Sequence, residues 1–180
     1  VRQPVVEASY IVYPDNPDNP SMYYAKNGRT GLIEFSGKDA ADVIQAVIDA
    51  LKDGGRIFVD RGFYKLSRSI TLKPGISIEG VFPRRKNVEP NAPEWGVIEG
   101  GTVFVGDGTF PAFTGNNLVG VYLRNLGFKN FSYGLLFGDT NVLGIAFSRL
   151  ENLYFDNTTA CAIKLINFQH IRMSHIKAIL

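Results

Sequence analysis

The chain has 180 residues, of which 45% are hydrophobic and 20% charged, which is ordinary for a single globular domain. Its 19 basic and 17 acidic side chains leave a formal net charge of +2, so charge gives no reason to expect a nucleic-acid partner. No apolar run approaches the roughly 20 residues of a membrane-spanning helix, and the lone Cys161, which excludes an internal disulfide, is expected to be a buried thiol.

Residues 1–35 are expected to form an extended lead-in. The segments 9–13 and 22–25 have strand composition, and the prolines within 14–20 should prevent regular structure between them. Asn27-Gly28 is a hairpin signal that leads into a further strand at 32–35. We therefore expect a short antiparallel unit ahead of the main body.

One helix is predicted over about residues 39–52. Asp39 is a suitable N-cap, and the apolar side chains of Val43, Ile44, Val47, Ile48 and Leu51 form one stripe at helical spacing. Gly54-Gly55 should end the helix, because glycine accepts the left-handed backbone that follows a helix C-terminus.

After Gly55 the sequence consists of short apolar segments separated by Gly, Asn, Pro and Asp, which indicates many short strands. The expected strands are 56–59, 64–66, 70–72, 76–78, 102–105, 119–123, 135–137, 153–155 and 162–165. The proline-rich stretch 83–97, which carries the only tryptophan, Trp95, is predicted to be a long projecting loop.

An internal repeat is the most informative feature. Residues 123–132 match residues 150–159 without a gap, an offset of 27 residues (150 minus 123); a weaker copy at 171–177 follows 21 residues later (171 minus 150), and 78–82 is an earlier relative. Short strands in such repeats bury their apolar sides only by stacking in parallel on one another. The sequence therefore predicts an all-β parallel solenoid; helical and leucine-rich repeats do not fit the length or the pattern.

Superposing the copies predicts columns of side chains. Asn125 should lie over Asn152, and Asn130 over Asn157, as hydrogen-bonded turn residues. Two outward columns, Arg124–Glu151–Arg172 and Lys129–Asp156–Lys177, alternate in charge. They are interpreted either as ion pairs that set the register of the stack or as a polar face for an anionic glycan.

The order of the helix 39–50, Gly54-Gly55, the strand 56–59, Gly62-Phe63-Tyr64 and Ile76-Ser77-Ile78-Glu79-Gly80 resembles the N-terminal segment of the pectate-lyase-like superfamily. That resemblance implies a right-handed parallel β-helix over residues 36–180, with the helix as N-terminal cap. Residues 23–31 are similar to the start of uncharacterised archaeal and viral β-helix proteins. No C-terminal cap is recognised, so we expect the chain to be truncated there or to dock on another chain.

The family's catalytic motifs are not found. Neither an Asp-Asp pair, nor Gly-His-Gly, nor Arg-Ile-Lys occurs, so catalytic residues stay unknown and the chain is not assigned as an enzyme. A lyase or glycoside hydrolase is the activity that the resemblance would imply. No acidic cluster indicates a metal site, and Ca²⁺ as a cofactor would follow from the resemblance alone.

Two hypotheses stay open. The first is a secreted or surface β-helix that binds polysaccharide and, if it is an enzyme, also processes it. Its candidate binding residues are Trp95, Arg124, Glu151, Asp156 and Arg172. The second is a non-catalytic structural protein such as a virion spike, a tail fibre or a cell-surface adhesin segment. Both place the chain outside the cell or on a virion or cell surface. Neither involves nucleic acid or a membrane span, and the second favours a homo-oligomer, such as a trimer, or the rest of a longer solenoid at the C-terminal end.

Overall fold

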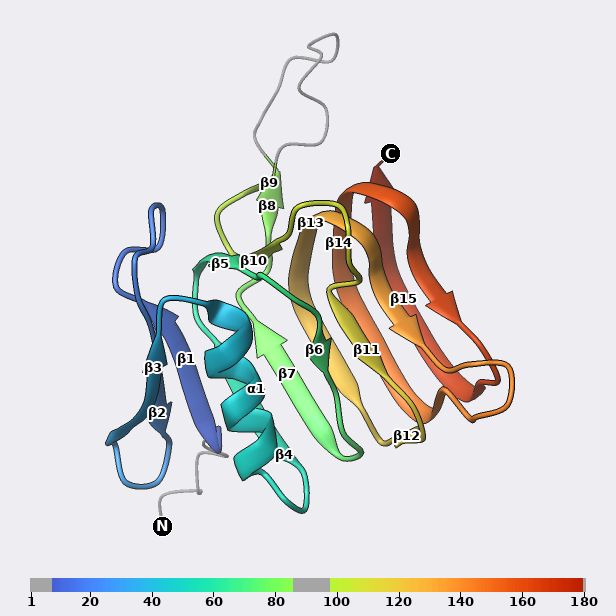
Figure 1. Cartoon of the computed structure of the whole chain (residues 1–180), viewed down its shortest axis with the longest axis horizontal. Helices are drawn as coiled ribbons and strands as arrows, with labels where there is room; N and C mark the ends of the chain where they lie inside the picture. Colours follow the sequence, from blue (N-terminus) through green and yellow to red (C-terminus); the bar gives the residue numbers. More distant parts are fainter. Residues whose placement is uncertain (1–7, 86–97, 180) are drawn as a thin grey trace, which may run out of the picture.

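The computed structural model describes residues 8–85 and 98–179, which form mainly β-structure with one helix, α1 (Ala40–Ala50). Figure 1 shows the strands arranged from β2 and β3 at one side of the molecule, through β1, β4 and β7, to β15 at the other, with α1 against the first strands. The strands are β1 (Tyr10–Pro14), β2 (Tyr23–Asn27), β3 (Ile33–Gly37), β4 (Gly55–Val59), β5 (Gly62–Lys65), β6 (Ile70–Thr71), β7 (Ile76–Gly80), β8 (Arg84–Arg85), β9 (Ile98–Glu99), β10 (Thr102–Val105), β11 (Phe113–Gly115), β12 (Leu118–Val119), β13 (Tyr122–Phe137), β14 (Ile145–Leu165) and β15 (Gln169–Ile179).

The N-terminal strands extend the main sheet. β1 pairs with β2 and β2 with β3, both antiparallel, while β1 pairs in parallel with β4. The predicted strands and the hairpin are thus confirmed, although Pro14 still belongs to β1. Asp15 organises the turn that follows, since its carboxylate accepts hydrogen bonds from the backbone N–H groups of Asn16, Ser21 and Met22 and from the Ser21 hydroxyl. These hydrogen bonds, those of Ser21 foremost, hold the pKa of Asp15 well below its usual range.

Helix α1 forms as the sequence predicts, but it ends at Ala50. The Asp39 carboxylate accepts a hydrogen bond from the Ala41 N–H at 2.9 Å, which caps the first turn. The buried face comprises Ala40, Ala41, Val43, Ile44, Val47 and Ile48. This face contacts β2, β3, β5 and β6, so the helix covers the interior of the molecule beside the first strands.

Beyond the helix the strands pair in parallel in three stacks. The first stack joins β4, β7 and the beginnings of β13, β14 and β15. The second joins β5, β10, the middle of β13 and β14 and the end of β15, and the third joins β6, β11 and the ends of β13 and β14. Ile78, Leu123 and Leu150 are consecutive Cα partners, so the parallel stacking predicted from the repeat is confirmed for those three copies.

The core is built of side-chain columns that run across the strands. In the second stack Tyr64, Phe104, Phe128 and Phe155 are successive partners, with ring-centroid distances of 5.6, 5.6 and 5.1 Å. All four rings are buried. Parallel in-register pairing brings like residues together, and here it forms an aromatic ladder that fills the middle of the molecule.

Asparagine ladders bend β13 and β14 between stacks. Asn125 and Asn152 have φ of 58° and 52°, and the Asn152 side-chain amide donates to Asn125 Oδ1 at 2.9 Å. Asn157 donates to Asn130 in the same way at 2.8 Å. Both predicted asparagine columns are confirmed, because asparagine accepts left-handed backbone more readily than other side chains do and its amide can pair along the column.

The register predicted for the last copy is wrong. Leu150 pairs with Met173, an offset of 23 residues (173 minus 150), rather than with Ile171. This register places Ile176 over Leu153 and puts His175, with φ of 53°, at the left-handed corner of Asn152. The predicted register would instead have put the polar Ser174 at the core position of Leu153.

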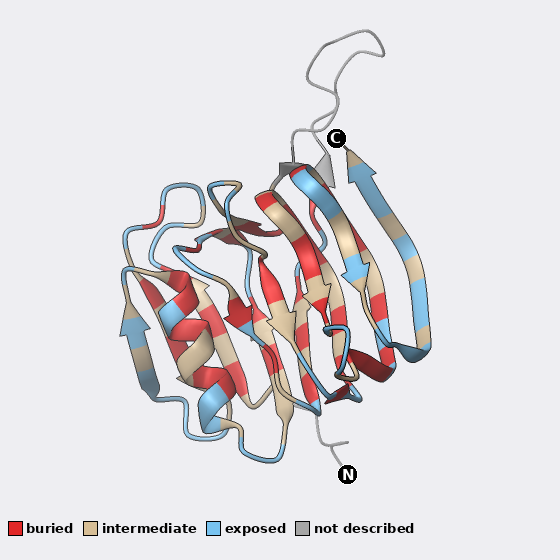
Figure 2. Ribbon diagram, turned by 45° about the vertical axis from the view of Figure 1, so that its right-hand side comes forward, coloured by how far each residue is buried: buried red, intermediate tan, exposed pale blue. Residues whose placement is uncertain are grey.

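The sheet does not close, and the side formed by β15 is open. β15 pairs with β14 alone among the described residues, and Figure 2 shows it largely exposed, in contrast to the buried strands behind it. Cys161, predicted to be buried, is exposed. It lies in the part of β14 beyond Asp156, where the described residues of β15 do not pair with β14.

Candidate functional site

The first stack carries a row of charged and aromatic side chains on its outward side, which we call the charged face. Inward positions of the same strands, such as Leu123 and Leu150, are fully buried, and the alternating residues point outward. The charged face comprises Arg56, Glu79, Tyr122, Arg124, Arg149, Glu151 and Arg172, which lie on β4, β7, β13, β14 and β15.

Part of this face is neutralised internally. Glu79 accepts contacts from two guanidinium groups, at 2.5 Å from Arg56 Nη2 and at 3.5 Å from Arg124 Nη1. The Tyr122 hydroxyl donates a hydrogen bond of 2.8 Å to Glu151. Burial and this hydrogen bond raise the pKa of Tyr122, so the phenol stays protonated at neutral pH. Arg124 and Glu151, predicted together, are indeed neighbours on paired strands.

Two arginines at the end of the face are not neutralised. Arg149 and Arg172 are direct Cα partners on β14 and β15, and both are exposed. Neither guanidinium has an ion pair within residues 8–85 and 98–179. The predicted column Arg124–Glu151–Arg172 is therefore wrong in its last member, because the 23-residue offset puts Ser174 opposite Glu151. Like charges directly opposite one another destabilise a sheet, so this pair has no structural benefit of its own.

The remaining candidates lie elsewhere. Asp156 belongs to the second stack, beyond the left-handed corner at Asn152, and its carboxylate contacts Lys129 Nζ at 3.5 Å. That ion pair was predicted, but Lys177 pairs with Tyr154 and does not join the column. Glu151 and Asp156 are thus not on one face. Trp95 lies outside the described residues.

An exposed aromatic pair beside the arginines was missed. Phe147 and His170 stack with their centroids 4.9 Å apart and their planes 6° apart, two residues before Arg149 and Arg172 respectively. Both have left-handed backbone, with φ of 47° and 48°. Extending the 27-residue offset upstream of the repeat aligns Phe147 with Gly120, and this alignment was the signal from which the position of Phe147 could have been predicted. The residue type itself gave no such signal, because phenylalanine, unlike asparagine, is not a residue expected to have left-handed backbone.

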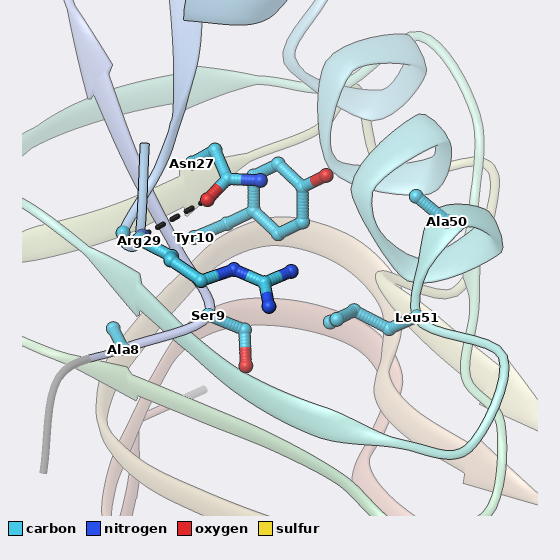
Figure 3. Close-up of a pocket in the computed structure, with 8 residues that line it drawn as sticks. Ala8, Ser9, Tyr10, Asn27, Arg29, Ala50 and Leu51 are labelled. Atoms are coloured by element: carbon cyan, nitrogen blue, oxygen red, sulfur yellow. Dashed lines mark hydrogen bonds between the residues drawn. The ribbon is translucent and has the colours of Figure 1, made fainter. Parts of the chain in front are cut away.

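Two hollows lie away from the charged face. One, of about 440 Å³, lies between the first hairpin and the end of α1, and Figure 3 shows the Arg29 side chain extending across it beside Tyr10 and Leu51. Its other polar groups are engaged, since Tyr10 donates to Glu34 and Ser9 Oγ accepts from Arg56 N. The second, of about 420 Å³, crosses the third stack, where Thr71 and Thr114 are partners on its wall. Neither gathers a set of groups that indicates chemistry.

The described part of the chain brings no three Asp, Glu, His or Cys side chains together in a group that could hold a metal ion. None of the helical structure in residues 8–85 and 98–179 has the length and apolar character needed to cross a bilayer. Comparisons with protein-family models, with curated proteins and with solved structures found no match.

Proposed function

We propose that this chain is a right-handed parallel β-helix of the pectate-lyase-like type whose charged face binds an acidic polysaccharide. The single observation that carries the proposal is the in-register pair Arg149 and Arg172, exposed and without ion pairs within the described residues. Such a partner implies a location outside the cell or on a virion or cell surface. We propose binding rather than catalysis, because the sequence carries none of the family's catalytic motifs.

The geometry of the face suits an extended anionic chain. A polysaccharide lying across the strands would meet Tyr122, Arg149 and Arg172 in succession, because these residues are consecutive partners about 4.8 Å apart. Each guanidinium can bind a carboxylate with two parallel hydrogen bonds, and the ligand's negative charge would relieve the repulsion between the two arginines. A hydroxyl-bearing sugar also finds polar neighbours in Tyr122 and Glu151.

Removing the arginine pair should weaken binding without harming the fold. In Arg149→Ala/Arg172→Ala we expect affinity for polygalacturonate to fall at least ten-fold, since a hydrogen bond to a charged group contributes about 1.5–3 kcal/mol. The free energy of unfolding should stay level or rise by up to about 1 kcal/mol, because a like-charge pair is removed. Titration calorimetry and urea unfolding measure the two quantities.

The matched control is Arg61→Ala, which removes an exposed guanidinium that forms a 3.7 Å ion pair with Asp18, away from the charged face. It should leave affinity unchanged. A neutral polysaccharide such as dextran should bind neither protein. Equal affinity of the double variant and the unaltered chain for polygalacturonate would refute the proposal.

A second candidate function, structural assembly, is favoured by the open side of the sheet. β15 presents an unpaired strand edge in the described residues, and Met173, at a core position of the stack, is 50% exposed. An exposed strand edge with apolar side chains is a template for pairing with another strand.

Substituting Met173→Lys should weaken such assembly, because an edge lysine opposes strand addition. We expect sedimentation velocity to show concentration-dependent association of the unaltered chain and a shift to monomer in the variant. Lys52→Met, which changes an exposed residue after α1, serves as the control that should not alter association. A monomer at every concentration for the unaltered chain would exclude assembly through this edge.

A further inference from the structure

Phe147 is held in a conformation that no other phenylalanine of the described residues adopts. Among these residues the non-glycine positions with positive φ are otherwise all asparagine or histidine: Asn117, Asn125, Asn130, Asn152, Asn157, Asn167, His170 and His175. Left-handed backbone is unfavourable for a bulky side chain, and strain of this kind concentrates at binding sites. Phe147 is also 61% exposed, so burial does not compensate for the strain.

The ring of Phe147 has a neighbour on one side only. His170, its partner on β15, stacks on it in parallel. On the other side the aligned residue is Gly120, because Val119 pairs with Ala146 and Tyr122 with Arg149. Gly120 is itself left-handed, with φ of 68°, and a Cβ built on it meets no atom within 4 Å. The aromatic column is therefore interrupted at Gly120 by open space.

From these contacts we infer that Phe147 and Gly120 form a sugar-ring subsite of the charged face. This inference rests on the proposed function. A pyranose ring would lie on the face of Phe147 in the space over Gly120, taking the place that a third ring would have in the column. Its C–H bonds would contact the electron-rich aromatic face. Its carboxylate would reach Arg149, two residues along the strand and roughly 7 Å away.

The charges around this subsite agree with an acidic sugar. Arg149 and Arg172 lie two residues beyond Phe147 and His170 on their strands, and the nearest acidic partner on the face, Glu151, is occupied by the Tyr122 hydroxyl. The Tyr122 side chain, two residues after Gly120, borders the same space on the neighbouring strand. A neutral or cationic ring would leave the arginine pair without a counter-charge.

The decisive variant is Phe147→Asn, because asparagine fits the left-handed corner better than phenylalanine does. We expect its Tm to rise by about 2–4 °C as backbone strain is relieved, while affinity for a galacturonic acid trimer falls roughly ten-fold. Phe147→Tyr should retain affinity. Gly120→Asn should also weaken binding, because it fills the space while keeping the left-handed backbone. Phe168→Asn, at an exposed phenylalanine outside the column, is the matched control and should bind normally.

The outcomes separate the subsite from the proposed function. Weaker binding in Phe147→Asn and in Arg149→Ala/Arg172→Ala supports both. Full affinity in Phe147→Asn, with weaker binding in the arginine variant, overturns the subsite and leaves the charged face in place. Failure of the unaltered chain to bind either the trimer or polygalacturonate overturns both. Calorimetry for affinity and a thermal melt of each variant provide these readings.

Discussion

Phe128→Ala is expected to lower the free energy of unfolding by about 3–5 kcal/mol, the range for emptying a fully buried phenylalanine site. Phe128 is the central ring of the aromatic ladder, with centroids 5.6 Å from Phe104, 5.1 Å from Phe155 and 5.2 Å from Phe113. Neighbours on both adjacent strands are held by in-register backbone pairing, so they cannot collapse into the cavity. The decrease in the free energy of unfolding should therefore include most of the energetic cost of leaving a cavity at this site.

Urea unfolding followed by far-UV circular dichroism measures this loss as a lower midpoint at unchanged slope. If Phe128→Ala does not fold, Phe128→Leu, which retains most of the volume, should show a smaller loss of about 1–1.5 kcal/mol. Phe168→Ala, which truncates a phenylalanine that is 56% exposed, should change stability by less than about 0.5 kcal/mol. Similar losses at Phe128 and Phe168 would contradict a ladder that carries the core.

Asn152→Val should destabilise the protein by about 2–3 kcal/mol for two separate reasons. The side-chain hydrogen bond to Asn125, at 2.9 Å, would be lost, at roughly 1 kcal/mol. A β-branched residue would also have to adopt φ near 52°, which costs roughly another 1–2 kcal/mol. The expected effect exceeds that of an ordinary partly exposed substitution because the corner joins two stacks.

Asn152→Gly separates the two contributions. Glycine adopts positive φ without strain, so this variant should lose only the hydrogen-bond contribution, with a small entropic cost. Chemical denaturation of both variants gives the difference directly. If the glycine variant is as unstable as the valine variant, backbone conformation is not what asparagine supplies at this corner.

Much of the architecture could be read from local pattern. The stripe from Val43 to Ile48 and the cap at Asp39 specify α1 through nearest-neighbour contacts on the helix itself. The repeat at 123–132 and 150–159 specifies its own register, because two asparagines and the apolar residues between them coincide in one alignment alone. Such features depend on residues close in sequence or on a strict repeat, and they were predicted correctly.

The charged face was predicted only in part. Arg124 and Glu151 lie within the clear repeat and were placed as neighbours, as the structure has them. Arg172 lies in the weak copy, where a shift of two residues changes its partner from Glu151 to Arg149. That shift turns an apparent ion-pair ladder into an unneutralised arginine pair, on which the functional proposal depends. Alternation with a period of two keeps Arg172 outward in either register, so its own position in the pattern does not distinguish them. The distinguishing position lies beyond the corner, where Ile176 rather than Ser174 packs over Leu153.

What the amino-acid order alone established is the kind of structure: one helix, parallel stacking of short strands, and asparagine corners, all of which follow from short-range preferences and an internal repeat. The tertiary structure decided which side chains meet across strands far apart in the chain. The open space over Gly120 beside Phe147 depends on the pairing of β12 with β14. The pairing of Arg149 with Arg172 depends on the register of the last strand, which is set by the packing of Met173 and Ile176 over the preceding strand, a long-range balance of burial.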